Sequence, residues 1–286
     1  MMDNMMLRYS SFFLLFLGSL LAKEYTFAIY PSNSPAKVVQ ALTPLMEYLQ
    51  DQTGETFHLI ITKDYEEIAT RIRENSVDFA WLNTKNYVLL QDQVPSLTYL
   101  ATYQERSKSG AITPYYQAFI IALKEENIHT LHEAKGRHFA FTDKDSTSGY
   151  AYPMMLFHEQ GINPYTFFSK VFFLKKHDNI PLALMNYSID LGAVSDGTYY
   201  TAKEHYGDIF SIVAMSKPIP LDAIVATQSA PLELQKRAQH ALERLSEDAP
   251  AMLAFREHLG WASAGFVHQE AEFYTSFKHA LKNQTP

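Results

Sequence analysis

The chain has 286 residues, no cysteine and a formal net charge of −7 at pH 7. Without cysteine it can form no disulfide, no thiolate nucleophile and no Cys-ligated zinc site. An acidic chain that lacks a run of Lys or Arg argues against a nucleic-acid partner. Any anion that it binds must be held by local geometry, because the overall field repels anions.

Residues 1–22 are predicted to be a cleaved secretory signal peptide. Arg8 precedes a short apolar run at 12–17, and small residues follow up to Ala22. A membrane anchor is the alternative, but spanning a bilayer takes about 20 consecutive apolar residues and this run is shorter. A lipoprotein would need a cysteine where Lys23 stands. We therefore expect a soluble periplasmic protein whose remaining length suits two lobes.

The first part of the mature sequence alternates short apolar runs with amphipathic stretches, which predicts an α/β fold. Strands are expected at 25–30, 57–61 and 77–81. Pro35 opens a predicted helix whose apolar residues recur at helical spacing as far as Gly54. Asp64 can cap a second helix over 65–73.

A second α/β unit is predicted downstream. Its strands are expected at 116–123, 138–142, 171–174 and 189–194, and its helices from Ser146 to Gly161 and over 180–187. Strands at 209–215 and 223–227 are interpreted as returning to the first lobe, and 231–281 is predicted to be helical with a break at Gly260. The predicted lobes are 23–113 together with 216–286, and 114–215.

Three consecutive hydroxyl residues, Ser146, Thr147 and Ser148, lie between a predicted strand and a predicted helix. The first turn of a helix leaves unpaired N–H groups and a partial positive charge at its end. The hydroxyls add donors, and Gly149 would let the backbone approach a ligand closely. Charge-assisted hydrogen bonds of this kind contribute on the order of 1.5–3 kcal/mol each. These residues alone fit a tetrahedral-oxyanion site and a plain Ser/Thr N-cap equally well.

From Tyr25 to about Trp261 the chain resembles the phosphate/phosphite/phosphonate-binding periplasmic components of ABC importers. The patterns that carry the resemblance, in family order, are Lys63–Tyr65, Val77–Trp81, Tyr115–Ile120, Asp145–Tyr150 with Pro153, His177–Asp178, Asp190–Ala193, Pro218–Asp222 and Leu259–Trp261. The resemblance implies a type II periplasmic-binding-protein fold. In that fold two α/β lobes, each a mixed sheet flanked by helices, are joined by two crossing strands and hold the ligand in the cleft between them.

The resemblance also implies which residues bind the anion. The Ser146–Ser148 run matches the helix start that grips the phosphonyl oxygens in the family. Tyr65 matches a first-lobe tyrosine that reaches the anion, and Tyr115 a tyrosine at the crossover. His177 matches a histidine of the second lobe that contacts the anion, and it would act as a pH-sensitive donor.

The part of the ligand beyond the anion is less defined by the resemblance. Asp222 matches an acid that pairs with the ammonium group in aminoalkylphosphonate binders. Those binders carry a second acid where Gly197 stands here, and the neighbouring Asp196 is the expected substitute. Leu82 replaces the family's aromatic residue in the wall of the first lobe. The sequence therefore supports the anion grip better than any particular organic tail.

Each of these residues also has a purely structural alternative. Tyr65 could be an exposed first residue of its helix, His177 a surface histidine and Asp222 a turn residue. Tyr115 and Tyr116 are adjacent in a strand and face opposite sides, so at most one lines the cleft.

Enzymatic and metal chemistry are less favoured by the sequence. Ser148, His177 and Asp222 could be written as a hydrolase triad, but no nucleophile-elbow pattern surrounds the serine. There is no P-loop and no dinucleotide fingerprint. A loose group of His and Glu residues is interpreted as surface residues rather than metal ligands; it comprises His129, His132, Glu133 and His138. We expect no catalysis, no cofactor and no metal.

The leading functional hypothesis is a periplasmic solute-binding protein that captures a phosphonate, phosphite or phosphate-like oxyanion. Its closed form would dock on the permease of an ABC importer. The alternative is that the closed form engages the periplasmic domain of a sensor histidine kinase.

Overall fold

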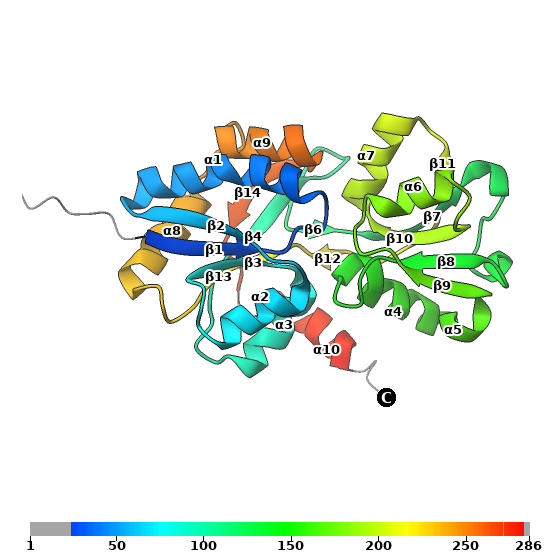
Figure 1. The fold of residues 1–286 in the computed structure, drawn as a ribbon, viewed down its shortest axis with the longest axis horizontal. Helices are drawn as coiled ribbons and strands as arrows, with labels where there is room; N and C mark the ends of the chain where they lie inside the picture. The colour runs from blue at the N-terminus through cyan, green and yellow to red at the C-terminus, as the bar shows by residue number, and fades with distance from the viewer. Residues whose placement is uncertain (1–23, 271, 283–286) are drawn as a thin grey trace, which may run out of the picture.

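The structure is a computed structural model that describes residues 24–270 and 272–282, and it shows two α/β lobes side by side (Figure 1). The predicted signal peptide at 1–22 lies outside these residues. Within the described ranges, no helix combines the length and the apolar character needed to cross a membrane.

The first lobe is built on a seven-stranded mixed sheet with the strand order β14-β4-β13-β3-β1-β2, and β5 pairs with β4. The parallel strands are β1 (Glu24–Ile29), β2 (Thr56–Ile61) and β3 (Phe79–Leu82). The antiparallel strands are β4 (Thr98–Arg106), β5 (Ile112–Thr113), β13 (Ala223–Ala226) and β14 (Ser263–Val267).

Helices cover both faces of this sheet (Figure 1). One core cluster packs beneath α1 (Pro35–Thr53), α8 (Leu232–Glu243) and α9 (Pro250–Leu259). The other packs beneath α2 (Tyr65–Arg73), α3 (Thr84–Gln93) and α10 (Thr275–Lys282). Alternate residues of β1 serve the two clusters, since Phe27 and Ile29 enter the first and Ala28 enters the second.

The second lobe is built on a five-stranded sheet with the order β11-β7-β10-β8-β9. Its strands are β7 (Ala118–Leu123), β8 (His138–Phe141), β9 (Lys170–Phe173), β10 (Leu191–Ser195) and β11 (Phe210–Met215). One face is covered by α4 (Tyr152–Glu159) and α5 (Pro164–Phe167), the other by α6 (Asn179–Met185) and α7 (Asp196–Tyr206).

Two short strands cross between the lobes and hydrogen-bond to each other. β6 (Tyr115–Tyr116) pairs antiparallel with β12 (Ile219–Pro220), and Leu221 N donates to Pro114 O at 2.8 Å. The expected fold, with two mixed-sheet lobes joined by two crossing strands, is confirmed.

Several local predictions match the structure and have clear causes. α1 runs from Pro35 to Thr53, and Gly54 ends it with a φ of 74° that glycine adopts without strain. α2 spans the predicted 65–73, and Asp64 Oδ1 accepts a hydrogen bond from Glu67 N at 2.8 Å.

Other expectations were wrong. β11 pairs with β7 and forms an edge of the second-lobe sheet, so it does not return to the first lobe. The expected strand 116–123 is interrupted at Gln117, whose side chain donates to Ser216 O at 2.8 Å. The C-terminal part contains β14 between its helices, and the elements α3, β4 and α7 were missed.

Candidate ligand-binding site

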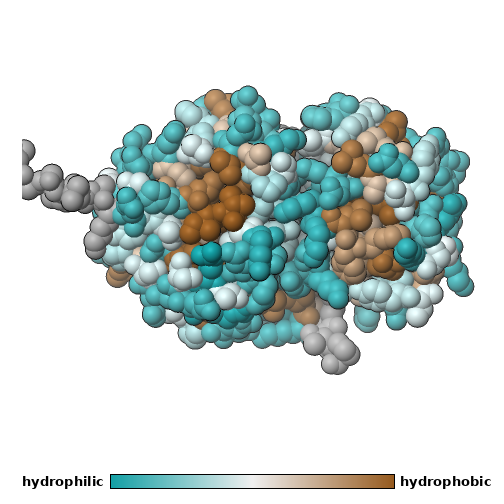
Figure 2. Space-filling view, viewed as in Figure 1, coloured by the Kyte–Doolittle hydropathy of each residue, from teal (hydrophilic) through white to brown (hydrophobic). Residues whose placement is uncertain are grey.

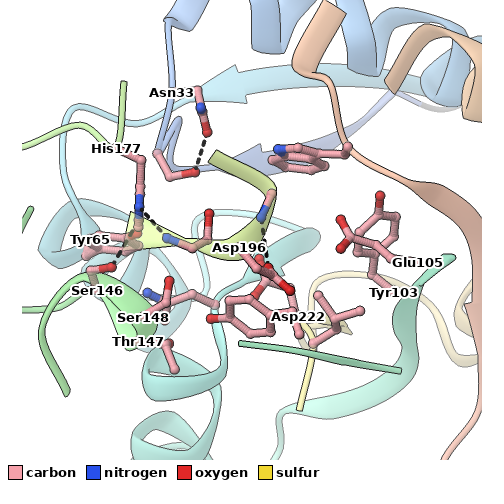
Figure 3. Close-up of a pocket in the computed structure, with 17 residues that line it drawn as sticks. Asn33, Tyr65, Tyr103, Glu105, Ser146, Thr147, Ser148, His177, Asp196 and Asp222 are labelled. Carbon is pink, nitrogen blue, oxygen red and sulfur yellow. Dashed lines mark hydrogen bonds between the residues drawn. The ribbon is translucent and has the colours of Figure 1, made fainter. Parts of the chain in front are cut away.

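A cavity of about 80 Å³ lies between the lobes, beside the crossing strands (Figure 3). A cavity needs about 10–15 Å³ of this volume to hold one water molecule, so this cavity has room for about five water molecules or a small anion. Seven of the predicted site residues line it: Tyr65, Ser146, Thr147, Ser148, His177, Asp196 and Asp222. Residues far apart in the sequence, from both lobes, therefore meet in one enclosed space.

One end of the cavity is formed by the helix start that the sequence singled out. Ser146 is the N-cap, and its Oγ accepts a hydrogen bond from Gly149 N at 3.0 Å. Thr147–Ala151 form a single π-helical turn, which continues directly into α4. Thr147 and Ser148 are buried in this first turn, where backbone N–H groups have no acceptor within the helix. Hydroxyl and N–H donors therefore converge at the positive end of a helix, as an oxyanion requires.

Gly149 lies behind the helix start, against Thr142. It does not line the cavity, and a Cβ added to it would lie 1.7 Å from Thr142 Oγ1 and 2.8 Å from Thr142 Cβ. Thr142 N also donates to Gly149 O at 3.2 Å. Glycine is thus required at this position because the turn packs against Thr142 at the end of β8.

His177 faces the helix start from the segment between β9 and α6 (Figure 3). Its Nδ1 accepts a hydrogen bond from Ser195 N at 3.2 Å, and its Nε2 lies 3.3 Å from Ser146 Oγ. These contacts assign the proton to Nε2, which makes that atom a donor. Burial, with a smaller effect of the positive Lys176, lowers the pKa of His177 to about 4. The imidazole is therefore neutral near pH 7 in the unliganded site, and its role as a pH-sensitive donor to the anion stays a prediction.

Two tyrosines complete this end of the cavity. Tyr65 is buried and its ring lies 4.0 Å from that of Tyr30. Burial raises the pKa of Tyr65 well above its usual value, so its hydroxyl remains a neutral donor. Of the adjacent pair at the crossover, Tyr116 lines the cavity. Tyr115 is 40% exposed and packs on Phe273, so the structure places it outside this space.

Three carboxyl groups occupy the other end. Trp81 Nε1 donates to Asp222 Oδ2 at 3.0 Å, and Gly197 N and Gln117 N donate to the Asp196 carboxylate at 2.8 and 3.1 Å. The third is Glu105, which β4 carries into the same cavity (Figure 3). Burial is the main cause that raises the pKa of Asp196 to about 6, of Asp222 to about 7 and of Glu105 to about 8. The neighbouring acids raise the pKa of Glu105 further.

Glu105 is the acidic residue of the cavity that the sequence reasoning missed, because β4 itself was not predicted. Tyr103 and Glu105 share a face of this strand, and both line the cavity. Had the strand been recognised, an acidic residue two positions after a buried tyrosine would have been the available signal.

The lobes touch directly on either side of the cavity. On one side Asn33 Nδ2 donates to Asp178 Oδ1 at 2.7 Å. On the other, Lys85 N donates to Thr147 Oγ1 at 3.0 Å, and Lys85 Nζ pairs with Asp145 Oδ1 at 2.9 Å. The boundary between the lobes is largely hydrophilic on the face shown in Figure 2, and hydrophobic patches lie away from it on each lobe. The lobes therefore contact each other through polar groups on both sides of the cavity.

Comparison with known proteins agrees with this geometry. Residues 27–274 match the family described as "ABC transporter, phosphonate, periplasmic substrate-binding protein". The phosphate-import protein PhnD of Mycolicibacterium smegmatis is 27% identical over 178 residues, which cover 60% of this chain and 54% of that protein. The match thus spans about half the length of that relative. The phosphonates-binding periplasmic protein of Escherichia coli is 23% identical over 84% of this chain and 71% of its own length.

Solved structures show the same fold. PhnD1 from Prochlorococcus marinus, in complex with methylphosphonate, superposes with a TM-score of 0.79 at 14% identity and covers 91% of this chain and 98% of its own. A binding protein component of an ABC phosphonate transporter from Pseudomonas aeruginosa superposes with a TM-score of 0.73 at 20% identity, covering 92% and 95%.

Proposed function

This chain belongs to the family of periplasmic substrate-binding proteins of phosphonate ABC transporters, and we propose from that premise that its interlobe cavity captures a phosphonate-type oxyanion for delivery to an ABC permease. Members of this family are transport components rather than enzymes. We propose 23–113 with 216–286, and 114–215, as the two lobes that close on the ligand.

The observation that supports the anion site best is the kind of donor that surrounds it. The Ser146–Ser148 hydroxyls, Tyr65 and the Nε2–H of His177 face one enclosed space, and no Lys or Arg of the described chain lines it. Neutral donors at a helix start can satisfy the oxygens of a tetrahedral anion despite the acidic net charge. A ligand that left these buried groups unpaired would be penalised.

Thr147 connects the anion to the closure of the lobes. Its Oγ1 accepts the hydrogen bond from Lys85 N of the first lobe, so its own O–H remains available to donate to the anion. A ligand that orients this hydroxyl therefore favours the same arrangement that the interlobe bond requires. Ligand binding would then shift the population of the protein from open to closed forms.

The anion site is tested by the double substitution Thr147→Ala and Ser148→Ala. We expect the binding of methylphosphonate and inorganic phosphate to fall at least 100-fold, because two hydroxyl donors are lost from a buried site. Isothermal titration calorimetry measures the affinity, and thermal unfolding without ligand checks the fold. Ser188→Ala, an exposed serine of the same lobe, is the matched control. Unchanged affinity in the double variant would refute the site.

Transport also requires that the ligand leaves unaltered. We propose that phosphorus NMR of the released ligand shows the starting compound after prolonged incubation.

The family match favours an ABC permease as the partner, and no observation on the described residues favours a sensor kinase instead. Crosslinking of the ligand-loaded protein to its permease in membrane vesicles is the corresponding test, and crosslinking to a sensor kinase in the same assay would reverse the assignment.

A further inference from the structure

The segment that leads into α10 contacts both strands that cross between the lobes. The ring of Phe273 packs on that of Tyr115 in β6, and the ring centres lie 5.2 Å apart. The hydroxyl of Tyr274 donates to Leu221 O, directly after β12, at 2.9 Å. The crossing strands carry the chain from one lobe to the other, so a hinge motion would bend them. Two adjacent aromatic residues therefore contact the hinge.

A chain of hydroxyl groups attaches this segment to the sheet of the first lobe. The hydroxyl oxygens of Tyr99 and Thr102 in β4 lie 2.7 Å apart, and Thr102 Oγ1 lies 2.6 Å from that of Tyr274. Because Tyr274 gives its proton to the crossing strand, it accepts from Thr102, and Thr102 accepts from Tyr99. Lys278 of α10 also pairs with Asp92 of α3. The C-terminal segment is therefore part of the first lobe.

The same helix brings Phe277 into contact with the second lobe (Figure 1). The Phe277 side chain is 1% exposed, and its ring is stacked on that of Tyr152 in α4, with centres 5.0 Å apart and planes 8° apart. Ala151 and Met155 of the second lobe pack in the same apolar cluster. Apolar packing of the first lobe thus continues across the boundary onto α4.

Tyr152 is joined directly to the turn that forms the anion end of the cavity. Its backbone N–H donates to Thr147 O, and Ala151 N donates to Ser146 O at 3.1 Å. These two bonds belong to the π-helical turn itself. Neither Tyr152 nor Phe277 lines the interlobe cavity. The first lobe therefore contacts the anion turn from behind, outside the space proposed for the ligand.

We propose that Phe277 and Tyr152 are positioning residues for ligand binding, whose stacked rings hold the Ser146–Ser148 turn in place against the first lobe. The proposal rests on the proposed function, because it assumes that the oxyanion occupies this turn. The cavity takes donors from both lobes, since Tyr65 comes from the first and the turn from the second. A contact that already favours this arrangement reduces the cost of bringing the donors together, and so raises the affinity.

The test measures the affinity for methylphosphonate and inorganic phosphate by isothermal titration calorimetry. Phe277→Leu and Tyr152→Leu keep an apolar side chain but remove the ring stack, so each should weaken binding about 5-fold or more. Tyr152→Phe keeps the stack and should bind within about 2-fold of the unmodified protein. The double leucine variant should lose no more than about the larger single loss, because both substitutions break one contact.

Phe57→Leu is the matched control. Phe57 is a buried aromatic residue of the first lobe, and its ring packs on Tyr25 of the same lobe with centres 6.5 Å apart. This variant should lower the melting temperature but leave the affinity within about 2-fold, because its contact does not join the lobes. Tyr152 is only partly buried, so Tyr152→Leu still decides the question if Phe277→Leu fails to fold.

Two results would overturn the positioning role. One is a lower melting temperature with unchanged affinity in the single leucine variants, which would mean that the rings only stabilise the fold. The other is a double variant whose loss is the product of the two single losses, which would mean that the rings act independently. Failure of the unmodified protein to bind either anion would instead refute the proposed function.

Discussion

The charge state of single residues controls much of what this site can bind. Glu105, Asp196 and Asp222 hold their protons more tightly in the folded protein than ordinary acids do. An acid whose folded pKa exceeds its unfolded pKa stabilises the fold fully only below the unfolded pKa, which is about 4 for these residues. That stability is lost as the pH rises through the pKa values of these acids in the folded protein, which lie between about 6 and 8.

We therefore predict that the melting temperature of the unliganded protein falls between pH 5 and pH 8.5. The fall should be smaller in Glu105→Gln and in Asp222→Asn, because a neutral amide has no proton to lose. Differential scanning calorimetry across this range measures the effect. Asp208→Asn is the control, because Lys124 and Lys203 lower the pKa of this exposed acid to about 2, far below the range. An identical slope in all variants would contradict the prediction.

Ligand affinity should show the opposite dependence for a cationic tail. We predict that the ratio of 2-aminoethylphosphonate affinity to propylphosphonate affinity rises from pH 6 to pH 8, because the carboxyl groups become charged. The ratio largely cancels the titration of the phosphonate group, which the two ligands share. The charged groups that face the three acids include Lys108, which favours the ionised form of Asp196. A ratio that stays constant with pH would show that the acids do not contact the amine.

The sequence revealed the residues that follow a compact local pattern. Ser146, Thr147 and Ser148 form a run next to a predicted helix, so their common location could be inferred. Glu105 could not be found in this way, since its place in the site depends on the pairing of β4 with β13 and β14. Tyr115 and Tyr116 show the limit of reading a site from sequence. Neighbouring side chains of a strand point to opposite faces, so at most one of the two tyrosines lines the cavity, and the sequence alone does not tell which one.

At the level of elements, the π-helical turn before α4 depends on close packing against Thr142. Gly149→Ala should cost about 1–3 kcal/mol of unfolding free energy, as overpacking of a buried site does. Removing the obstructing hydroxyl in the double variant Thr142→Ala, Gly149→Ala should restore part of this loss. Thr142 Oγ1 is buried without a hydrogen-bond partner, so Thr142→Ala alone should be tolerated. Urea denaturation of the three variants measures the effect, and a fully stable Gly149→Ala would rule out the packing role.

Helices whose apolar residues recur at helical spacing after a capping residue could be predicted from the sequence. Other elements could not, because they are stabilised by contacts with neighbouring elements. α2 has Asp64 as its cap and buries Ile68 and Ile72 on one face. α7 has few buried residues and is held by the Ser195 cap and by the packing of Tyr199. β14 contains Gly265 with a φ of 124° and a register shift against β4, and this irregularity breaks the alternating pattern of a strand.

For the whole molecule, the polar contacts between the lobes determine how much of the protein is closed. Lys85→Ala removes the ion pair with Asp145, so we predict that ligand affinity falls several-fold because the closed form is less populated. The radius of gyration of the unliganded protein, measured by small-angle scattering, should increase. Lys236→Ala is the control, since this exposed lysine pairs with Glu233 within the same helix. No change in either measurement would contradict the role of the contact.

The C-terminal helix also links the lobes. The ring of Phe277 in α10 stacks on Tyr152 of α4 at 5.0 Å and 8°. Figure 1 shows α10 below the first lobe, next to α4. The contact between these helices belongs to the closed arrangement, and the sequence could not indicate it because it joins residues 125 positions apart in different lobes (277 minus 152).

The positions of the two tryptophans have a practical consequence. Trp81 donates to Asp222, Trp261 lines the interlobe cavity, and the centres of their rings lie 6.0 Å apart. All of the chain's indole emission therefore originates beside the cleft. Unlabelled protein should report occupancy through its intrinsic fluorescence, without a dye and without a background from distant tryptophans. Iodide quenching could then follow the opening and closing of the lobes in real time.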